Sequence, residues 1–458
     1  MYEIGSEFNY IEKEEARDLT AMYEGSGDVR FLRCGRDAIG YVCEDIENIA
    51  LARAEAVNSH KEEKSANCRG ALRYVALLPA LCCDSMYRPF EVHGAEVMFY
   101  GINEDLSVDT DSLKKTIDDI CSQGEDKPVI MVLTAVYYGI TDISSLNSFI
   151  KSIDDGIYVI EDVTQGVLAP STFDTDNADY IIGSIRKWMG VPDGAVAIRN
   201  NKVINNHIKG QNLLDTDDDH ISDGIATDRF SIEPLKGENS FAAERSKALR
   251  MKTQYLQNGD KELKTRFREL LGHAEDTLTD GEDMYEISDE SRRYLESVPV
   301  EKIVSTRNNN YDTLYELLEK SAHNNVYFKL FPKKKTGMPA FMLPVMIDTD
   351  RLNKDIADNT KNDNKKDNHI SGNAGQESSC DKDHVIDRDG FERLLAGKGI
   401  YAPVLWPVSD EAAKVCPVSK DIADHILCFW IDQRYDRFDM VQTKECFEET
   451  IDELLRRQ

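Results

Sequence analysis

The sequence predicts an α/β protein in which a large, mostly parallel β-sheet is sandwiched by helices and followed by a smaller C-terminal α+β domain. Between residues 31 and 200, short β-branched apolar runs alternate with helical patterns, which is typical of a parallel sheet with helical crossovers. A chain of 458 residues is also long enough for more than one core. Beyond residue 298, helical and strand patterns mix, which indicates a second unit.

The strands of the large domain are predicted from runs that are short, β-branched and bounded by turn residues. These runs are 73–79, 95–100, 128–134, 157–162, 180–184 and 195–198. The helices between them are predicted where apolar residues recur on one face. These segments are 37–54, 111–121 and 143–153.

The remaining segments divide the chain into four parts. We expect an N-terminal arm over residues 1–28, a large domain over 29–240, connecting helices over 241–297 and a small domain over 298–458. Residues 209–239, rich in Asp and Gly, are predicted to be an exposed loop. Residues 241–278 form one long helical pattern, or two helices broken at Gly259.

The small domain is predicted to contain helices and strands around a polar insert. The helices are expected at 310–323, 389–397 and 444–457, and the strands at 341–347 and 425–431. Residues 353–384 are almost without apolar side chains, so little burial would offset the entropy lost on ordering them. This insert is therefore expected to be disordered.

Composition excludes several classes of protein. The chain is 41% hydrophobic and 30% charged, and its formal charge of -29 disfavours binding to nucleic acids or to anionic membranes. No apolar run approaches the roughly 18 residues of a membrane span, and the first residues lack a basic region followed by an apolar one. Ten cysteines without a Cys-x-x-Cys pair predict reduced thiols, a cytoplasmic location and no metal site.

Two residues suited to chemistry follow neighbouring predicted strands. Asp162 ends one strand, and Lys187 comes three residues after Ser184, which ends the next. Because open α/β sheets bind ligands at the carboxyl ends of their strands, we expect Asp162 and Lys187 to lie beside each other. A lysine for a Schiff base and an acid for a pyridinium nitrogen are what pyridoxal phosphate (PLP) requires.

Each of these two residues also has an ordinary interpretation. Most lysines at helix starts are solvated, and an acidic strand end often caps a turn. Lys187, however, directly follows a buried strand and precedes the turn 190–194, where a lysine can be desolvated enough to act as a nucleophile. A carboxylate at the end of an apolar run is costly unless it is paired, and a protonated pyridine nitrogen would pair with Asp162.

A phosphate site is predicted at the start of the helix 37–54. Gly35 and Arg36 precede this amphipathic helix, whose first N–H groups can bind an anion. Asp37 acting only as a helix cap is the alternative. Ser184 and Arg186 can add a hydroxyl and a cation to the site.

Three further side chains are candidates for contact with cofactor or substrate. Gln165 can either hydrogen-bond the cofactor or satisfy the backbone, and both interpretations stay open. Arg434 lies among aromatic residues and can either bind a substrate carboxylate or form a structural salt bridge. Tyr138 is the third candidate, as a substrate contact.

These positions, taken in order, resemble the fold-type I PLP enzymes, most nearly the DegT/StrS family of sugar aminotransferases. By this resemblance Lys187 forms the Schiff base and moves protons, and Asp162 pairs with the pyridine nitrogen. Gly35, Arg36 and Ser184 bind the phosphate. The resemblance covers residues 28–200 and, more loosely, 300–458. Its motifs are Cys34-Gly35-Arg36-Asp37-Ala38-Ile39, 78–85, 94–97, Tyr137-Tyr138-Gly139, 160–162, 184–188, 399–403 and 431–435.

The resemblance implies a homodimeric PLP-dependent aminotransferase that moves an amino group from an amino acid to a keto acceptor, for which a nucleotide-linked sugar is one candidate. Leu81 stands where the family usually has an aromatic residue, and residues 200–260 lack the family's Gly-x-Asn-x-Arg-Met pattern. These departures leave the substrate open. The alternatives are another PLP reaction, such as a lyase, or a PLP-binding sensory protein without turnover.

Overall fold

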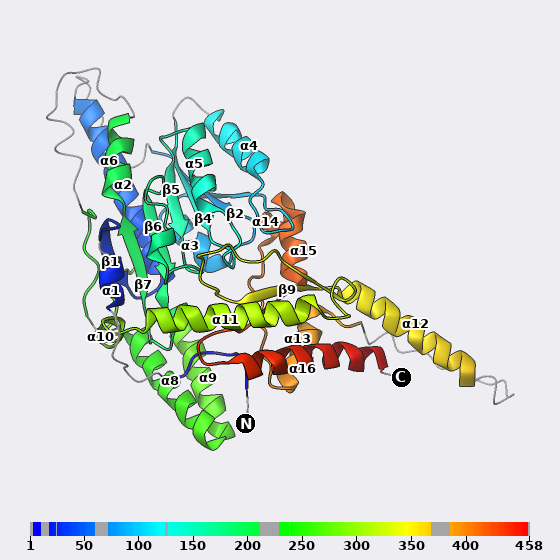
Figure 1. Cartoon of the computed structure of the whole chain (residues 1–458). Helices are drawn as coiled ribbons and strands as arrows, with labels where there is room; N and C mark the ends of the chain where they lie inside the picture. The colour runs from blue at the N-terminus through cyan, green and yellow to red at the C-terminus, as the bar shows by residue number, and fades with distance from the viewer. Residues whose placement is uncertain are drawn as a thin grey trace.

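A seven-stranded sheet lies at the centre of the large unit (Figure 1). The computed structural model describes residues 3–10, 18–23, 25–59, 72–123, 127–210, 229–237, 239–367 and 385–456. The strand order is β1-β7-β6-β5-β4-β2-β3, parallel from β6 to β3, with β7 antiparallel to β6 and β1. The strands are β1 (Asp28–Leu32), β2 (Tyr74–Pro79), β3 (Glu96–Tyr100), β4 (Val129–Ala135), β5 (Tyr158–Asp162), β6 (Tyr180–Ser184) and β7 (Ala195–Arg199).

Helices flank this sheet and confirm the α/β class predicted from the sequence. The longest, α2, packs against β6 and β7, while α5 packs against β4 and β5, and α4 against β3. Strands β5, β6 and β7 are buried along their whole length, as expected where both faces of a sheet are covered. The helices of this unit are α1 (Leu19–Met22), α2 (Gly35–Ser59), α3 (Asp84–Val92), α4 (Thr110–Cys121), α5 (Ile143–Ile153), α6 (Asn201–Gly210) and the 3-10 turns Pro170–Thr172 and Ile185–Lys187.

A second apolar core surrounds a three-stranded antiparallel sheet of order β10-β9-β8. The ring of Phe447 lies at its centre, with the rings of Phe328, Phe429 and Phe391 at 5.0, 5.2 and 5.6 Å. Ile4 of the N-terminal segment joins this core through a bridge to Ile400. Its elements are α11 (Val300–Glu319), β8 (Phe328–Leu330), β9 (Leu343–Ile347), α12 (Thr349–Asp367), α13 (Arg388–Gly397), α14 (Asp410–Val415), α15 (Pro417–His425), β10 (Ile426–Phe429) and α16 (Arg437–Arg456).

Two packed helices connect the units. They are α8 (Ser240–Asn258) and α9 (Lys261–Asp276), and a short α10 (Asp289–Leu295) follows. Gly259 ends α8 with φ of 71°, a left-handed conformation that suits glycine. Of the two arrangements expected for 241–278, the structure therefore shows two helices broken at Gly259.

The expectation of disorder in the insert is wrong for its first part. Residues 353–367 belong to α12, whereas 368–384 lie outside the described residues. Leu352 is fully buried and anchors the helix, which packs against α16. The side chain of Asn353 both donates to Ile386 O and accepts from Ile386 N, at 2.8 and 2.9 Å. These tertiary contacts help to offset the entropy lost on ordering this helix, which its polar side chains alone would not offset.

The acidic run 215–219 of the predicted loop lies outside the described residues. Part of the loop is described, and there Phe230 is buried against the rings of Tyr41 and Tyr180. Within the described ranges, no helix combines the length and the apolar character that crossing a bilayer requires.

Candidate functional site

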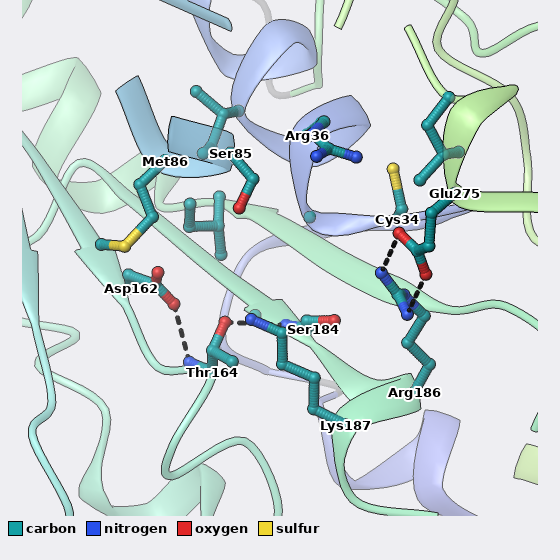
Figure 2. Close-up of a pocket in the computed structure, with 15 residues that line it drawn as sticks. Cys34, Arg36, Ser85, Met86, Asp162, Thr164, Ser184, Arg186, Lys187 and Glu275 are labelled. Atoms are coloured by element: carbon teal, nitrogen blue, oxygen red, sulfur yellow. Dashed lines mark hydrogen bonds and ion pairs between the residues drawn. The ribbon is translucent and has the colours of Figure 1, made fainter. Parts of the chain in front are cut away.

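One pocket brings together most of the residues selected from the sequence (Figure 2). Gly35 and Arg36 reach it from the start of α2, Asp162 from the end of β5, Ser184 from the end of β6, and Lys187 from the following 3-10 turn. The pocket encloses about 580 Å³, part of it open to solvent. It lies at the carboxyl ends of parallel strands, where this class of sheet binds ligands.

Asp162 presents a buried carboxylate to this pocket. The residue is 9% exposed, and its Oδ1 accepts a hydrogen bond from Thr164 N at 2.8 Å. Burial raises the pKa of Asp162, and the bonds from Thr164 and the charge of Lys187 offset only part of that effect. Among the described residues Asp162 has no ion-pair partner, so its carboxylate is available to a cation in the pocket.

Lys187 follows the buried strand β6 and is half-buried. Across the described ranges its amine forms no hydrogen bond and no ion pair, and the residue lines the pocket. Its charge influences Asp162, so the two groups are close enough to interact through the same cavity. An unpaired amine at a partly desolvated position is suited to act as a nucleophile.

Thr164 connects three residues at this edge of the sheet. Its backbone N–H donates to Asp162, its Oγ1 accepts from Ser184 N at 3.0 Å, and its carbonyl accepts from Trp188 Nε1 at 2.6 Å. Sequence reasoning missed this role. A hydroxyl residue two positions after a strand-ending acid was the available signal.

Two guanidinium groups, those of Arg36 and Arg186, also line the pocket. Arg186 forms a bidentate pair with Glu275 of α9, with N–O distances of 2.9 and 3.2 Å. Burial disfavours the charge of Arg186, but Glu275 and other nearby acidic groups raise its pKa overall. Arg36 Nε lies 3.4 Å from Asp280 Oδ1. Among the described residues, the buried Nε atoms of Arg36 and Arg186 form no hydrogen bond, and the contact of Arg36 Nε with Asp280 is an ion pair only.

Asp37 does not cap α2. Its carboxylate instead accepts two hydrogen bonds of 2.9 Å from Arg33 and one of 3.2 Å from Tyr285 N. The first N–H groups of α2 are therefore left for another acceptor. Together with Ser184 and the Nε atoms of Arg36 and Arg186, which form no hydrogen bond among the described residues, they form a donor set that fits a phosphate group.

The structure also shows where the other sequence candidates lie. Gln165 is buried outside the pocket lining, and its Oε1 accepts from Tyr138 N at 2.6 Å, while its Nε2 has no hydrogen-bond partner in the part of the chain that the structure describes. The hydroxyl of Tyr138 is buried against Leu405 O and Cys428 Sγ, at 3.3 and 3.2 Å. Neither Gln165 nor Tyr138 lines the pocket.

For Arg434 the structure shows the salt-bridge alternative. Its guanidinium forms a bidentate pair with Asp432, with two N–O distances of 2.8 Å. It also donates to Ser6 O and Glu7 O. Because Nε and both terminal nitrogens are already engaged, a substrate carboxylate has no free edge of this guanidinium to bind.

The start of α3 contributes two further residues to the pocket. Leu81 is fully buried and does not line the pocket, whereas Ser85 and Met86 from the start of α3 do. A methionine sulfur can contact an aromatic ring favourably. Ser85 ends one of the motifs that carry the resemblance, but no site role was predicted for Ser85, Met86 or Glu275, because only the tertiary fold brings them to the pocket.

Neither a protein-family model nor a curated protein matches the amino-acid sequence. Solved structures do match. A DegT/DnrJ/EryC1/StrS aminotransferase from Brucella abortus is 12% identical, with a TM-score of 0.51, over 94% of this chain and 87% of that one. The aminotransferase TlmJ from Streptoalloteichus hindustanus is 11% identical, with a TM-score of 0.54, over 99% and 100%.

A third structure is the PLP form of Spr1654 from Streptococcus pneumoniae, described as a sugar aminotransferase. It is 10% identical, with a TM-score of 0.55, over 99% of this chain and 100% of that one. The chain has the fold of these aminotransferases. At this level of identity the likeness establishes the fold alone.

Proposed function

We propose that this protein is a PLP-dependent aminotransferase that moves an amino group from an amino acid to a keto acceptor. The observation that carries the proposal is the convergence of Asp162, Lys187 and an anion-binding donor set on one pocket. The fold supports it, because Spr1654, which shares this fold, has been solved in PLP and PMP forms.

Each residue has a defined part in this proposal. Gly35, at the start of α2, with Arg36 and Ser184, would hold the phosphate through N–H, guanidinium and hydroxyl donors. Asp162 would hold the pyridine nitrogen in its protonated form. PLP, when bound, supplies the electron sink for carbanion chemistry. Lys187 would bind the cofactor covalently through a Schiff base and, once released, carry a proton as general acid and base.

We further propose a keto sugar as the acceptor, because sugar aminotransferases such as CalS13 share the fold. A homodimer and a cytoplasmic location belong to the same proposal. Light scattering tests the dimer: the expected mass is twice 51.9 kDa, and a mass of 51.9 kDa would contradict it.

The decisive experiment locates the covalent bond to the cofactor. The purified protein is incubated with PLP, reduced with borohydride, digested and sequenced by mass spectrometry. We expect the added pyridoxyl group on Lys187, and no labelled peptide in Lys187→Ala. A label spread over surface lysines, equal in both proteins, would overturn the proposal.

A second measurement separates the reaction classes. The absorbance spectrum of the PLP-loaded protein is recorded before and after addition of glutamate and other amino acids. Conversion towards the pyridoxamine spectrum by a donor indicates transamination. A spectrum that no donor changes would favour the lyase or the sensory alternative.

A further inference from the structure

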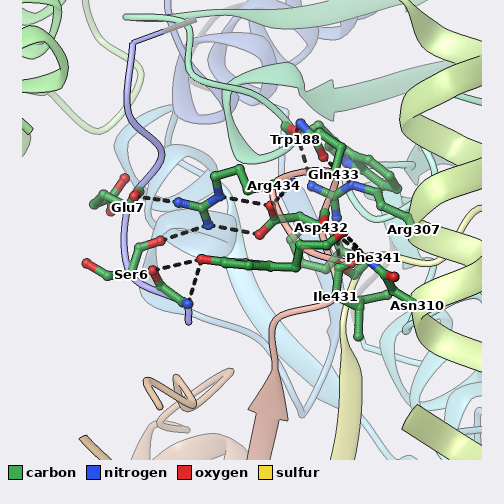
Figure 3. Close-up of polar contacts among 12 residues, drawn as sticks. Ser6, Glu7, Trp188, Arg307, Asn310, Phe341, Ile431, Asp432, Gln433 and Arg434 are labelled. Carbon is green, nitrogen blue, oxygen red and sulfur yellow. Dashed lines mark hydrogen bonds and ion pairs between the residues drawn. The ribbon is translucent and has the colours of Figure 1, made fainter. Parts of the chain in front are cut away.

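The backbone carbonyl of Trp188, the residue after Lys187, receives two hydrogen bonds from distant parts of the chain (Figure 3). Arg307 of α11 donates from its terminal NH2 nitrogen at 3.1 Å, and Gln433 donates from Nε2 at 2.8 Å. We call Arg307, Gln433 and the Trp188 carbonyl the carbonyl clamp. None of these three groups lines the pocket.

The two donors of the clamp are held as one unit. Arg307 Nε donates to Gln433 Oε1 at 2.9 Å, and another Arg307 nitrogen donates to Phe341 O at 2.8 Å. The Arg307 guanidinium also lies 4.5 Å from the centre of the Trp188 ring, a cation–π contact. Nε and both terminal nitrogens of the Arg307 guanidinium therefore each donate a hydrogen bond. A lysine ammonium could not reproduce this planar arrangement of donors.

Trp188 is fixed from its other side as well. Its ring is fully buried, and its Nε1 donates to Thr164 O, next to the bonds that hold Asp162 and Ser184. Its backbone N–H donates to Ile185 O at 2.9 Å. Trp188, the residue that follows Lys187, is thus held at its backbone N–H, at its backbone carbonyl and at its ring, while the Lys187 amine itself has no partner among the described residues.

The segment that carries Gln433 is anchored independently. Asp432 pairs with Arg434, and the amide of Asn310 donates to the carbonyls of Ile431, Asp432 and Tyr435. Arg307 is fully buried, and within the described part of the chain it forms no ion pair. Burying a guanidinium without an ion pair costs free energy of folding. The hydrogen bonds that Arg307 donates are therefore expected to serve a specific purpose.

We propose that Arg307 and Gln433 are positioning residues that fix the backbone of Lys187 through the Trp188 carbonyl, and thereby set where its amine meets the cofactor. This inference rests on the proposed function, because it takes Lys187 as the residue that binds PLP. Misplacement of a reacting group by a fraction of an ångström to an ångström has large effects on rate, so the clamp would act on chemistry rather than on substrate affinity.

The test uses the full-length, PLP-loaded protein. Gln433→Met removes one donor at a half-buried position, and Arg307→Met removes the other. Arg388→Met is the matched control, because Arg388 also donates to two backbone carbonyls, Ala423 O and Ile426 O, away from Lys187. Two properties are measured: the pH midpoint of the visible absorbance band, and the rate at which hydroxylamine releases the cofactor.

We expect both clamp variants to move the pH midpoint and to release cofactor roughly tenfold faster, because the lysine recaptures it less well. The double variant should change little beyond the single ones, since both donors act through one carbonyl. The control should match wild type in both properties. If Arg307→Met does not fold, Gln433→Met alone decides.

The failures of the two proposals are distinguishable. Wild-type midpoint and release rate in Gln433→Met would overturn the clamp, provided that borohydride still labels Lys187 in both proteins. Changes of equal size in Arg388→Met would also overturn it, because they would reflect general destabilisation. Absence of a label on Lys187 in the wild type would instead overturn the proposed function.

Discussion

The hydroxyl oxygen of Thr164 accepts a hydrogen bond from the backbone N–H of Ser184 at 3.0 Å. This bond ties the loop after β5 to the end of β6, beside the proposed cofactor pocket. It places the residue that would pair with the pyridine nitrogen and the residue that would hold the phosphate in a fixed relationship.

Thr164→Val should weaken PLP binding. Valine keeps the shape of threonine but leaves the partly buried Ser184 N–H without an acceptor. Leaving this donor unsatisfied costs about 1–3 kcal/mol of free energy at the end of β6, beside the phosphate donors. The dissociation constant for PLP, measured by absorbance titration, should rise accordingly. Thr116→Val, which removes a hydroxyl bond to Ser112 O within α4, is the control and should bind PLP as wild type does. Equal affinities of both variants would contradict the prediction.

Asp162→Asn should keep the cofactor and lose turnover. The amide oxygen still accepts from Thr164 N, so local geometry is retained, but the negative charge that would stabilise a protonated pyridine is gone. We expect turnover to fall by roughly 100-fold or more. Steady-state kinetics with bound PLP confirmed by borohydride labelling checks this. Turnover within a few fold of wild type would show that Asp162 does not serve the cofactor.

Glu161, the neighbour of Asp162, should make stability depend on pH. Burial raises the pKa of Glu161 from 4.5 to about 8, although Asp174 N donates to its carboxylate at 3.0 Å. Because the folded state binds this proton more tightly than the unfolded state, the contribution is present below pH 4.5 and is lost as pH rises through 8.

Glu161→Gln should therefore flatten the pH profile of the unfolding free energy between these limits. The variant gains stability relative to wild type as pH rises, because the buried position no longer ionises. Urea unfolding at a series of pH values measures this. Glu104→Gln, at an exposed carboxylate, should leave the profile unchanged. A wild-type slope in Glu161→Gln would refute the expectation.

Arg434→Met should destabilise the protein without abolishing PLP binding. The change leaves Asp432 buried and unpaired and removes the bonds to Ser6 and Glu7, a cost of about 3–5 kcal/mol. Urea unfolding gives the loss. The double variant with Asp432→Asn should recover part of it. A large change in donor affinity with unchanged stability would instead restore a substrate role for Arg434.

Local patterns predicted the elements that surround the site. Strand β6 and helix α5 have the predicted bounds, because both carry clear periodicity and end at turn residues or caps. The edge strand β1 was missed, since most of its short sequence is only half-buried. Glu275 and Met86 reach the pocket through tertiary packing, which no local pattern encodes. For Arg434, the side chain's ability to bind a carboxylate was evident from the sequence, but the identity of its partner, Asp432, depends on the tertiary fold.

The carbonyl clamp also bears on how the protein is made. Gln433 comes 245 residues after Trp188 in the chain. On a ribosome, the sheet around Asp162 and Lys187 can form long before this last donor emerges from the exit tunnel. By this proposal the lysine would gain its final position only after residue 433 has been synthesised and Gln433 has docked on the Trp188 carbonyl.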